Sequence, residues 1–149
     1  MSEYDLTRFL EAQEHGAASW TANYAVALAE MRAGRKHAHW IWYVFPQLKG
    51  LGSSPYAVQY GIDGLSEARA YLQEPTLRAR LIEIAETLLQ CKDDISLIAG
   101  WPDDMKIHAS MTLFHLADPT VPVFRQVLEQ FYAGDPHPGT LRLLKVKWQ

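Results

Sequence analysis

Apolar residues recur at helical spacing along most of this chain. The clearest case runs from about Thr76 to Gln90, where one stripe consists of Leu77, Leu81, Ile84, Ala85 and Leu88. Charged residues occupy the opposite face. Apolar residues spaced three and four apart predict an amphipathic α-helix that packs one side on a core. Proline and glycine interrupt the pattern repeatedly, which predicts several short helices.

Further helices are expected wherever a capping residue precedes such a stripe. They begin near Asp5, Thr21, Ser54, Ser66, Asp103, Thr120 and Pro138. The single strand-like run is Ile41 to Phe45. A lone strand has no partner for its edges, so this run is interpreted as helix or irregular core. The sequence therefore predicts an all-α fold, in which residues 1–149 form one compact domain of eight or nine short helices.

Charge and cysteine content restrict the class of protein. Fourteen basic and seventeen acidic residues give a net charge of −3, so no general attraction to nucleic acid or to an anionic membrane is expected. Cys91 is the only cysteine, which rules out an intramolecular disulfide and fits a reducing compartment. The first residues lack an apolar signal segment, and no run is long enough to span a membrane. A cytoplasmic protein is expected.

Two histidines, His37 and His39, raise the question of a metal site. Residues two apart share a face only in a strand, and a zinc site needs three or four ligands. Neither a His-x-x-x-His pair nor a cysteine pair stands nearby. The sequence therefore predicts no metal and implies no cofactor.

Nucleophilic and phosphate-loop chemistry also fit poorly. Acidic residues Asp93 and Asp94 follow Cys91, and nearby acids raise the pKa of a thiol, which opposes a reactive thiolate. The glycines match neither a nucleophile elbow nor a nucleotide fingerprint. No motif decides whether the protein is an enzyme.

The segment from His37 to Gly52 carries more aromatic surface than an exposed loop can hold, with Trp40, Trp42, Tyr43 and Phe45. Most of these rings are expected in the core. Trp40 and Trp42 are two apart and cannot easily share one inward face. One of them is therefore a candidate to line a cleft and stack on a flat ligand. The basic residues nearby, Arg35, Lys36 and Lys49, would favour an anionic group on that ligand.

A second candidate segment runs from Trp101 to Phe114. Asp103 is expected to cap a helix, with Asp104, Lys106 and His108 in its first two turns. A lysine near a helix start opposes the helix dipole, so Lys106 needs either an acid of its own helix or a bound anion. A solvated charged face is the alternative. Ser110 and Thr112 follow on the same helix as candidate ligand contacts.

These segments resemble a bacterial family known as a domain of unknown function, number eighteen-ten, some members of which are labelled calpastatin. The resemblance lies in HWIWYVFPQLKGLGSS, in Leu65 to Leu72, in PTLRARL and in GWPDDMKIHASMTLF. It implies a compact all-α domain in a bacterial cytoplasm and supplies no activity. Two positions depart from the residues common in that family: Glu74 replaces a histidine and Ala109 replaces a serine. The order of elements also resembles small helical proteins that process NAD or ADP-ribose derivatives.

The leading hypothesis is a pocket between the two segments that binds an anionic, nucleotide-like or ADP-ribose-like small molecule. Trp40 or Trp42 would stack on its ring, and Arg35, Lys36 or Lys106 would hold its charge. If the pocket hydrolyses such a molecule, Asp104 is the candidate base and His39 the candidate acid, since histidine titrates near neutrality. The alternative is a non-enzymatic protein-interaction module with a broad apolar surface. The sequence identifies no protein partner, and it leaves the oligomeric state open.

Overall fold

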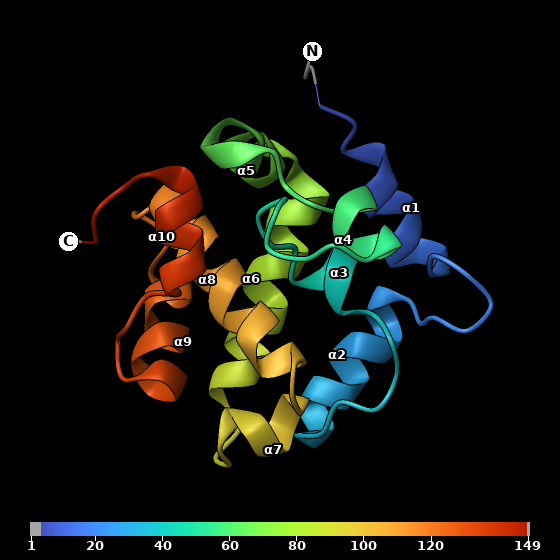
Figure 1. The fold of residues 1–149 in the computed structure, drawn as a ribbon. Helices are drawn as coiled ribbons and strands as arrows, with labels where there is room; N and C mark the ends of the chain where they lie inside the picture. The colour runs from blue at the N-terminus through green and yellow to red at the C-terminus, as the bar shows by residue number, and fades with distance from the viewer. Residues whose placement is uncertain (1–3, 149) are drawn as a thin grey trace.

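Ten helices follow one another in the computed structural model, which describes residues 4–148 (Figure 1). They are α1 (Thr7–His15), α2 (Tyr24–Ala33), α3 (Ile41–Val44), α4 (Pro55–Gln59), α5 (Gly64–Gln73), α6 (Pro75–Leu89), α7 (Ile95–Ala99), α8 (Asp103–Ala117), α9 (Pro122–Tyr132) and α10 (Pro138–Leu144). The all-α prediction is confirmed. The helices number ten in the described residues rather than eight or nine, because five residues in α7 are too few to produce a recognisable repeat.

Helix α8 lies at the centre of the arrangement and packs against α5, α7, α9 and α10 (Figure 1). More than half of its residues are buried, on every side of the helix: Ile107, Ala109, Ser110, Met111, Thr112, Leu113, Phe114 and Ala117. A helix with so many buried positions can be stable in water only when other helices surround it. Helices α1 to α4 cover one flank, and α9 and α10 cover the other (Figure 1).

The N-caps correct several sequence-based expectations. Ser54 caps α4 as predicted, because its Oγ accepts a 3.2 Å hydrogen bond from the amide of Ala57. Helix α2 is capped by Asn23 instead of Thr21, since the Thr21 hydroxyl accepts bonds from the preceding turn. Leu6 and Pro102 occupy the cap positions of α1 and α8 without a side-chain bond. The predicted caps Asp5 and Asp103 are therefore wrong.

The aromatic segment contains the four-residue helix α3, and most of its rings pack in the core. Trp40, Tyr43 and Phe45 are completely buried, whereas Trp42 is half-buried. A single parallel bridge joins Leu48 to Ile62, and no longer strand occurs among residues 4–148. The prediction that most of these rings belong to the core is confirmed. No helix in the described part of the chain is long and apolar enough to cross a bilayer.

Candidate functional site

Lys36 links the two candidate segments through a buried ion pair. Its Nζ lies 2.8 Å from Oδ2 of Asp103 and donates a 2.6 Å hydrogen bond to the carbonyl of Ala38. It also lies 4.9 Å from the ring centroid of Trp40. Only 6% of the Lys36 side chain is exposed. Lys36 is thus occupied by the protein's own carboxylate, and its prediction as an anion ligand is corrected.

Trp40 is likewise a structural residue. Its indole Nε1 donates a 2.8 Å hydrogen bond to Oε1 of Glu30, which also accepts bonds from the amides of His37 and Ala38. Burial raises the pKa of Glu30, but these three bonds together outweigh burial and hold that pKa below its ordinary value. A fully buried ring cannot stack on a ligand, so Trp40 is excluded from the predicted stacking role.

Trp42 remains accessible and belongs to a surface aromatic cluster with Trp20 and Tyr56. Its ring centroid lies 6.1 Å from that of Trp20 and 5.0 Å from that of Tyr56. Trp20 is itself exposed, and the Nζ of Lys106 lies 5.3 Å from the Trp42 centroid. An ammonium group over an indole is a favourable cation–π arrangement. The cluster therefore presents aromatic rings at the protein surface, with the ammonium group of Lys106 beside them.

Lys106 also lines a cavity of about 390 Å³, here called the α8 cavity. The cavity lies where the loop after α3, helix α4, the start of α8 and the residue before α10 meet. Its lining consists of Gln47, Leu51, Gly52, Ser53, Ser54, Ala57, Pro102, Met105, Lys106 and His137. The structure thus brings the two candidate segments together around the α8 cavity. Lys106 lies between this cavity and the surface aromatic cluster.

The charge of Lys106 is partly satisfied by its own helix. Its Nζ lies 3.4 Å from Oδ1 of Asp103, and 25% of its side chain is exposed. The same carboxylate lies closer to Lys36, at 2.8 Å. Asp103 is therefore shared between two ammonium groups, and Lys106 holds the longer and more exposed contact.

Ser110 and Thr112 lie inside the protein and do not line the α8 cavity. Both are completely buried. Thr112 Oγ1 donates to the carbonyl of His108 at 2.9 Å and accepts from the amide of His137 at 3.0 Å. Ser110 Oγ has no hydrogen-bond partner among the described residues. Ser110 is four residues after Lys106 and shares its face of α8, but neighbouring elements cover it completely, so the prediction of Ser110 and Thr112 as ligand contacts is corrected.

The candidate acid and base do not line the α8 cavity. His39 is exposed, and its ring lies edge-on to Trp20 at 5.4 Å. Oδ1 of Asp104 accepts a 2.9 Å hydrogen bond from the amide of Met105, and its carbonyl accepts one from Tyr132. The structure places both near the borders of the candidate site rather than within it.

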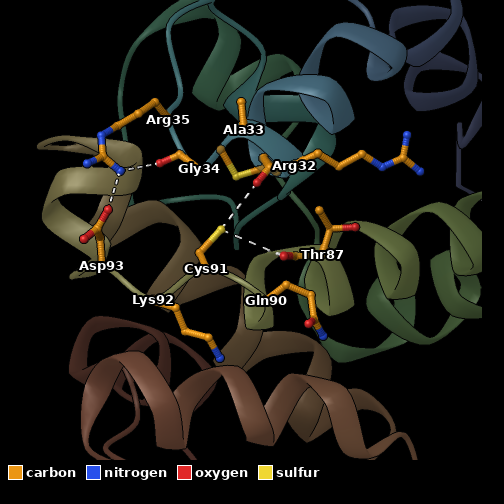
Figure 2. A pocket seen from close by; sticks show the side chains of 10 residues that line it. Arg32, Ala33, Gly34, Arg35, Thr87, Gln90, Cys91, Lys92 and Asp93 are labelled. Carbon is orange, nitrogen blue, oxygen red and sulfur yellow. Dashed lines mark hydrogen bonds and ion pairs between the residues drawn. The ribbon is translucent and has the colours of Figure 1, made fainter.

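Arg35 lies at a different cavity, of about 430 Å³, together with Cys91 (Figure 2). Its guanidinium lies 2.8 Å from the carboxylate of Asp93, and the nearby Arg32 and Lys92 side chains extend away from the cavity centre (Figure 2). The Cys91 thiol donates to the carbonyl of Met31 at 3.3 Å. Burial, and secondly Asp93, raise the pKa of this thiol. Arg35 therefore does not join Lys106, and Cys91 is not an activated nucleophile.

His137 is a titratable residue of the cavity that the sequence does not indicate as a site residue. Its Nδ1 lies 3.2 Å from the amide nitrogen of Thr140, so the side chain caps α10. Its ring lies edge-on to His108, which stacks on Tyr132 at 4.1 Å. The available signal was the order His137-Pro138, because a polar residue before a proline is typical of a helix start. Within the described residues, no group of His, Cys, Asp and Glu side chains could hold a metal ion.

These features define a small helical protein with an accessible cavity between its central helix and an aromatic segment. The chain belongs to the family described as "Protein of unknown function (DUF1810)", whose model matches residues 3–144. It is similar to the conserved hypothetical protein Rv1873 from Mycobacterium tuberculosis, with 44% sequence identity and a TM-score of 0.90. That similarity covers 98% of this chain and 100% of the other. None of the curated proteins matches the sequence.

Glu74 and Ala109, the two positions expected to differ from the residues common in the family, have structural roles here. Glu74 caps α6, because its Oε2 accepts a 2.7 Å hydrogen bond from the amide of Leu77. Ala109 is completely buried in α8. Neither position borders the α8 cavity.

Proposed function

We propose that the protein binds an anionic small molecule with a flat ring, such as a nucleotide or an ADP-ribose derivative, at the α8 cavity. The observation that supports this is the double position of Lys106. Lys106 lines the cavity, and its ammonium group lies over the ring of Trp42. A ligand whose anionic group approaches Lys106 could place its ring against the surface aromatic cluster. A base stacked on an aromatic side chain is worth about 1–3 kcal/mol.

The contact between Lys106 and Asp103 is weak enough for a ligand anion to replace Asp103 as the partner of Lys106. At 3.4 Å and with a quarter of the lysine exposed, it is the weaker of the two contacts that Asp103 makes. Partly exposed ion pairs contribute about 0–1 kcal/mol. A ligand anion that takes over Lys106 leaves Asp103 still paired with Lys36, so no carboxylate loses its last partner.

A thermal-shift comparison tests the proposal. AMP and ADP-ribose should raise the melting temperature, whereas adenosine, which lacks the charge, should raise it much less. Lys106→Met should weaken AMP binding by about 1.5–3 kcal/mol, the scale of a hydrogen bond to a charged group. Lys92→Met is the matched control, because it removes the same charge at the other cavity. Equal losses in both variants would show that only overall charge matters.

Hydrolysis is the chemical extension of this proposal, with Asp104 as base and His39 as acid. It is supported by the ring of His39, which lies 5.4 Å from that of Trp20 in the surface aromatic cluster, and by Asp104, which directly precedes Met105 of the cavity lining. Chromatography of ADP-ribose incubated with the protein tests it. Product should form with the unmodified chain and should disappear in Asp104→Asn while binding persists.

A protein-interaction module is the second candidate. It is supported by Trp101, which is 80% exposed and lies two residues before the start of α8, and by the exposed Met105. Large apolar side chains clustered on a surface are typical of interaction sites. If no nucleotide raises the melting temperature, while Trp101→Ser abolishes a concentration-dependent association measured by sedimentation, the module becomes the better assignment.

A further inference from the structure

The ring of His137 is held in one orientation by the start of α10. Its Nδ1 lies 3.2 Å from the amide nitrogen and 3.0 Å from Oγ1 of Thr140. Its own amide donates to Thr112 Oγ1, which fixes the backbone on the other side. Gly139 allows this close arrangement, since a Cβ there would lie 3.1 Å from Cε1 of the His137 ring.

The Thr140 bond determines which nitrogen carries the proton. A backbone amide can only donate, so Nδ1 must offer its lone pair. A neutral imidazole with a free lone pair on Nδ1 carries its hydrogen on Nε2. Burial, followed by His108 and Arg142, lowers the pKa of His137. Protonation of Nδ1 would also break the cap, so the ring stays neutral near pH 7.

Nε2 is the polar atom of this ring that remains available. It makes no hydrogen bond to the described residues, and it is not among the buried polar atoms that lack a partner. It is therefore accessible to solvent. His137 lines the α8 cavity together with Lys106, so the lining includes a residue with an N–H donor besides the lysine.

We infer that His137 is a fixed hydrogen-bond donor that selects an oxyanion, a phosphate or a carboxylate, held between its Nε2 and the Nζ of Lys106. The inference rests on the proposed function and adds the group that the ligand must present. It also assigns His137 a positioning role. A nitrogen that already carries hydrogen cannot take a proton from water, so Nε2 does not act as a general base.

Long-range ¹H–¹⁵N NMR of the imidazole rings tests the tautomer directly. At pH 7, His137 should show a protonated Nε2 and an unprotonated Nδ1. The opposite tautomer, or a doubly protonated ring, overturns the inference whatever the ligand proves to be. Addition of AMP should shift the Nε2 resonance of His137 and leave that of His37, an exposed histidine outside the cavity, in place.

Binding measurements with His137→Asn complete the test. Asparagine is a good N-cap, so the variant should retain α10 while losing the Nε2 donor. We expect its affinity for AMP to fall by about tenfold or more, and its melting temperature to stay close to that of the His37→Asn control. Adenosine-5′-carboxylic acid shows whether a carboxylate replaces the phosphate, and adenosine should bind weakly to every variant.

The outcomes separate the two proposals. If Lys106→Met weakens AMP binding and His137→Asn does not, the cavity binds an anion but the role of His137 is wrong. If the unmodified protein binds none of the charged probes, both proposals fail at this cavity. If His137→Asn unfolds the protein, His137→Gln is measured instead, and the NMR result still decides the tautomer.

Discussion

Lys36 Nζ and Asp103 Oδ2 lie 2.8 Å apart across the joint between the aromatic segment and α8. Lys36 follows α2 and Asp103 is the first residue of α8, so the ion pair connects two elements that are far apart in the sequence. The lysine is almost completely buried and also lies against Trp40. An ion pair in this position stabilises the boundary of the candidate site.

Lys36→Met should therefore destabilise the fold. Removing one member of a buried pair typically costs about 3–5 kcal/mol, because a charge is left without its partner. We expect the lower end, about 3 kcal/mol, since Lys106 still approaches Asp103. Urea unfolding measures the change. Lys106→Met is the control and should cost less than about 1 kcal/mol; similar losses in both variants would contradict the assigned roles.

Phe45→Ala should cost about 3–5 kcal/mol, the usual range for truncating a buried aromatic ring. Phe45 is almost completely buried and its ring lies 6.3 Å from that of Trp40. Leu97→Ala, at a side chain that is 58% exposed, provides the comparison. Equal midpoints in urea for the two variants would show that the aromatic segment is not part of the core.

Glu30 should make stability depend on pH in acid. Its folded-state pKa is held below the ordinary value of 4.5 by the bonds from His37, Trp40 and Ala38, despite burial. A lowered pKa gives a contribution that is complete above the unfolded value and is lost as the pH falls through the folded value. Between pH 7 and pH 3, the unmodified protein should lose more stability than Glu30→Gln. Glu86→Gln, on an exposed face of α6, should follow the unmodified protein.

Gly52→Ala should disturb the floor of the α8 cavity. A Cβ at position 52 would lie 2.9 Å from Cβ of Ala57, which is closer than two carbons can approach. Overpacking of this kind typically costs about 1–3 kcal/mol. Combining it with Ala57→Gly removes the clash, so a double-mutant cycle should show favourable coupling. Additive losses would mean that the loop moves away freely.

Metal removal should leave the protein unchanged. No suitable group of ligands occurs among residues 4–148. Dialysis against a chelator, followed by elemental analysis and a thermal melt, checks this. A stoichiometric ion whose loss lowers the melting temperature would overturn the argument from ligand number.

The helices follow closely from local sequence, and the site follows from it only in part. The stripe of α6 and the Ser54 cap of α4 are readable because both depend on residues within a few positions. Their positive charge makes Arg35 and Lys106 candidates for the same anion site, yet the two residues border separate cavities. His137 was missed, because nothing near position 137 in the chain indicates that it faces Lys106 across a cavity.

The sequence by itself determined that this chain forms short helices, buries its aromatic segment and carries the pattern of its family. The spacing of apolar residues and the positions of proline and glycine act over a few residues, so these properties depend only on local sequence. The tertiary structure alone decided whether Trp40 or Trp42 is accessible, and which lysine is buried in an ion pair. Trp40 and Lys36 can be buried because Glu30 of the preceding helix and Asp103 of the distant helix α8 satisfy their polar groups. Trp42 and Lys106 remain partly exposed, and Lys106 makes only the longer of the two contacts to the carboxylate that Asp103 shares with Lys36.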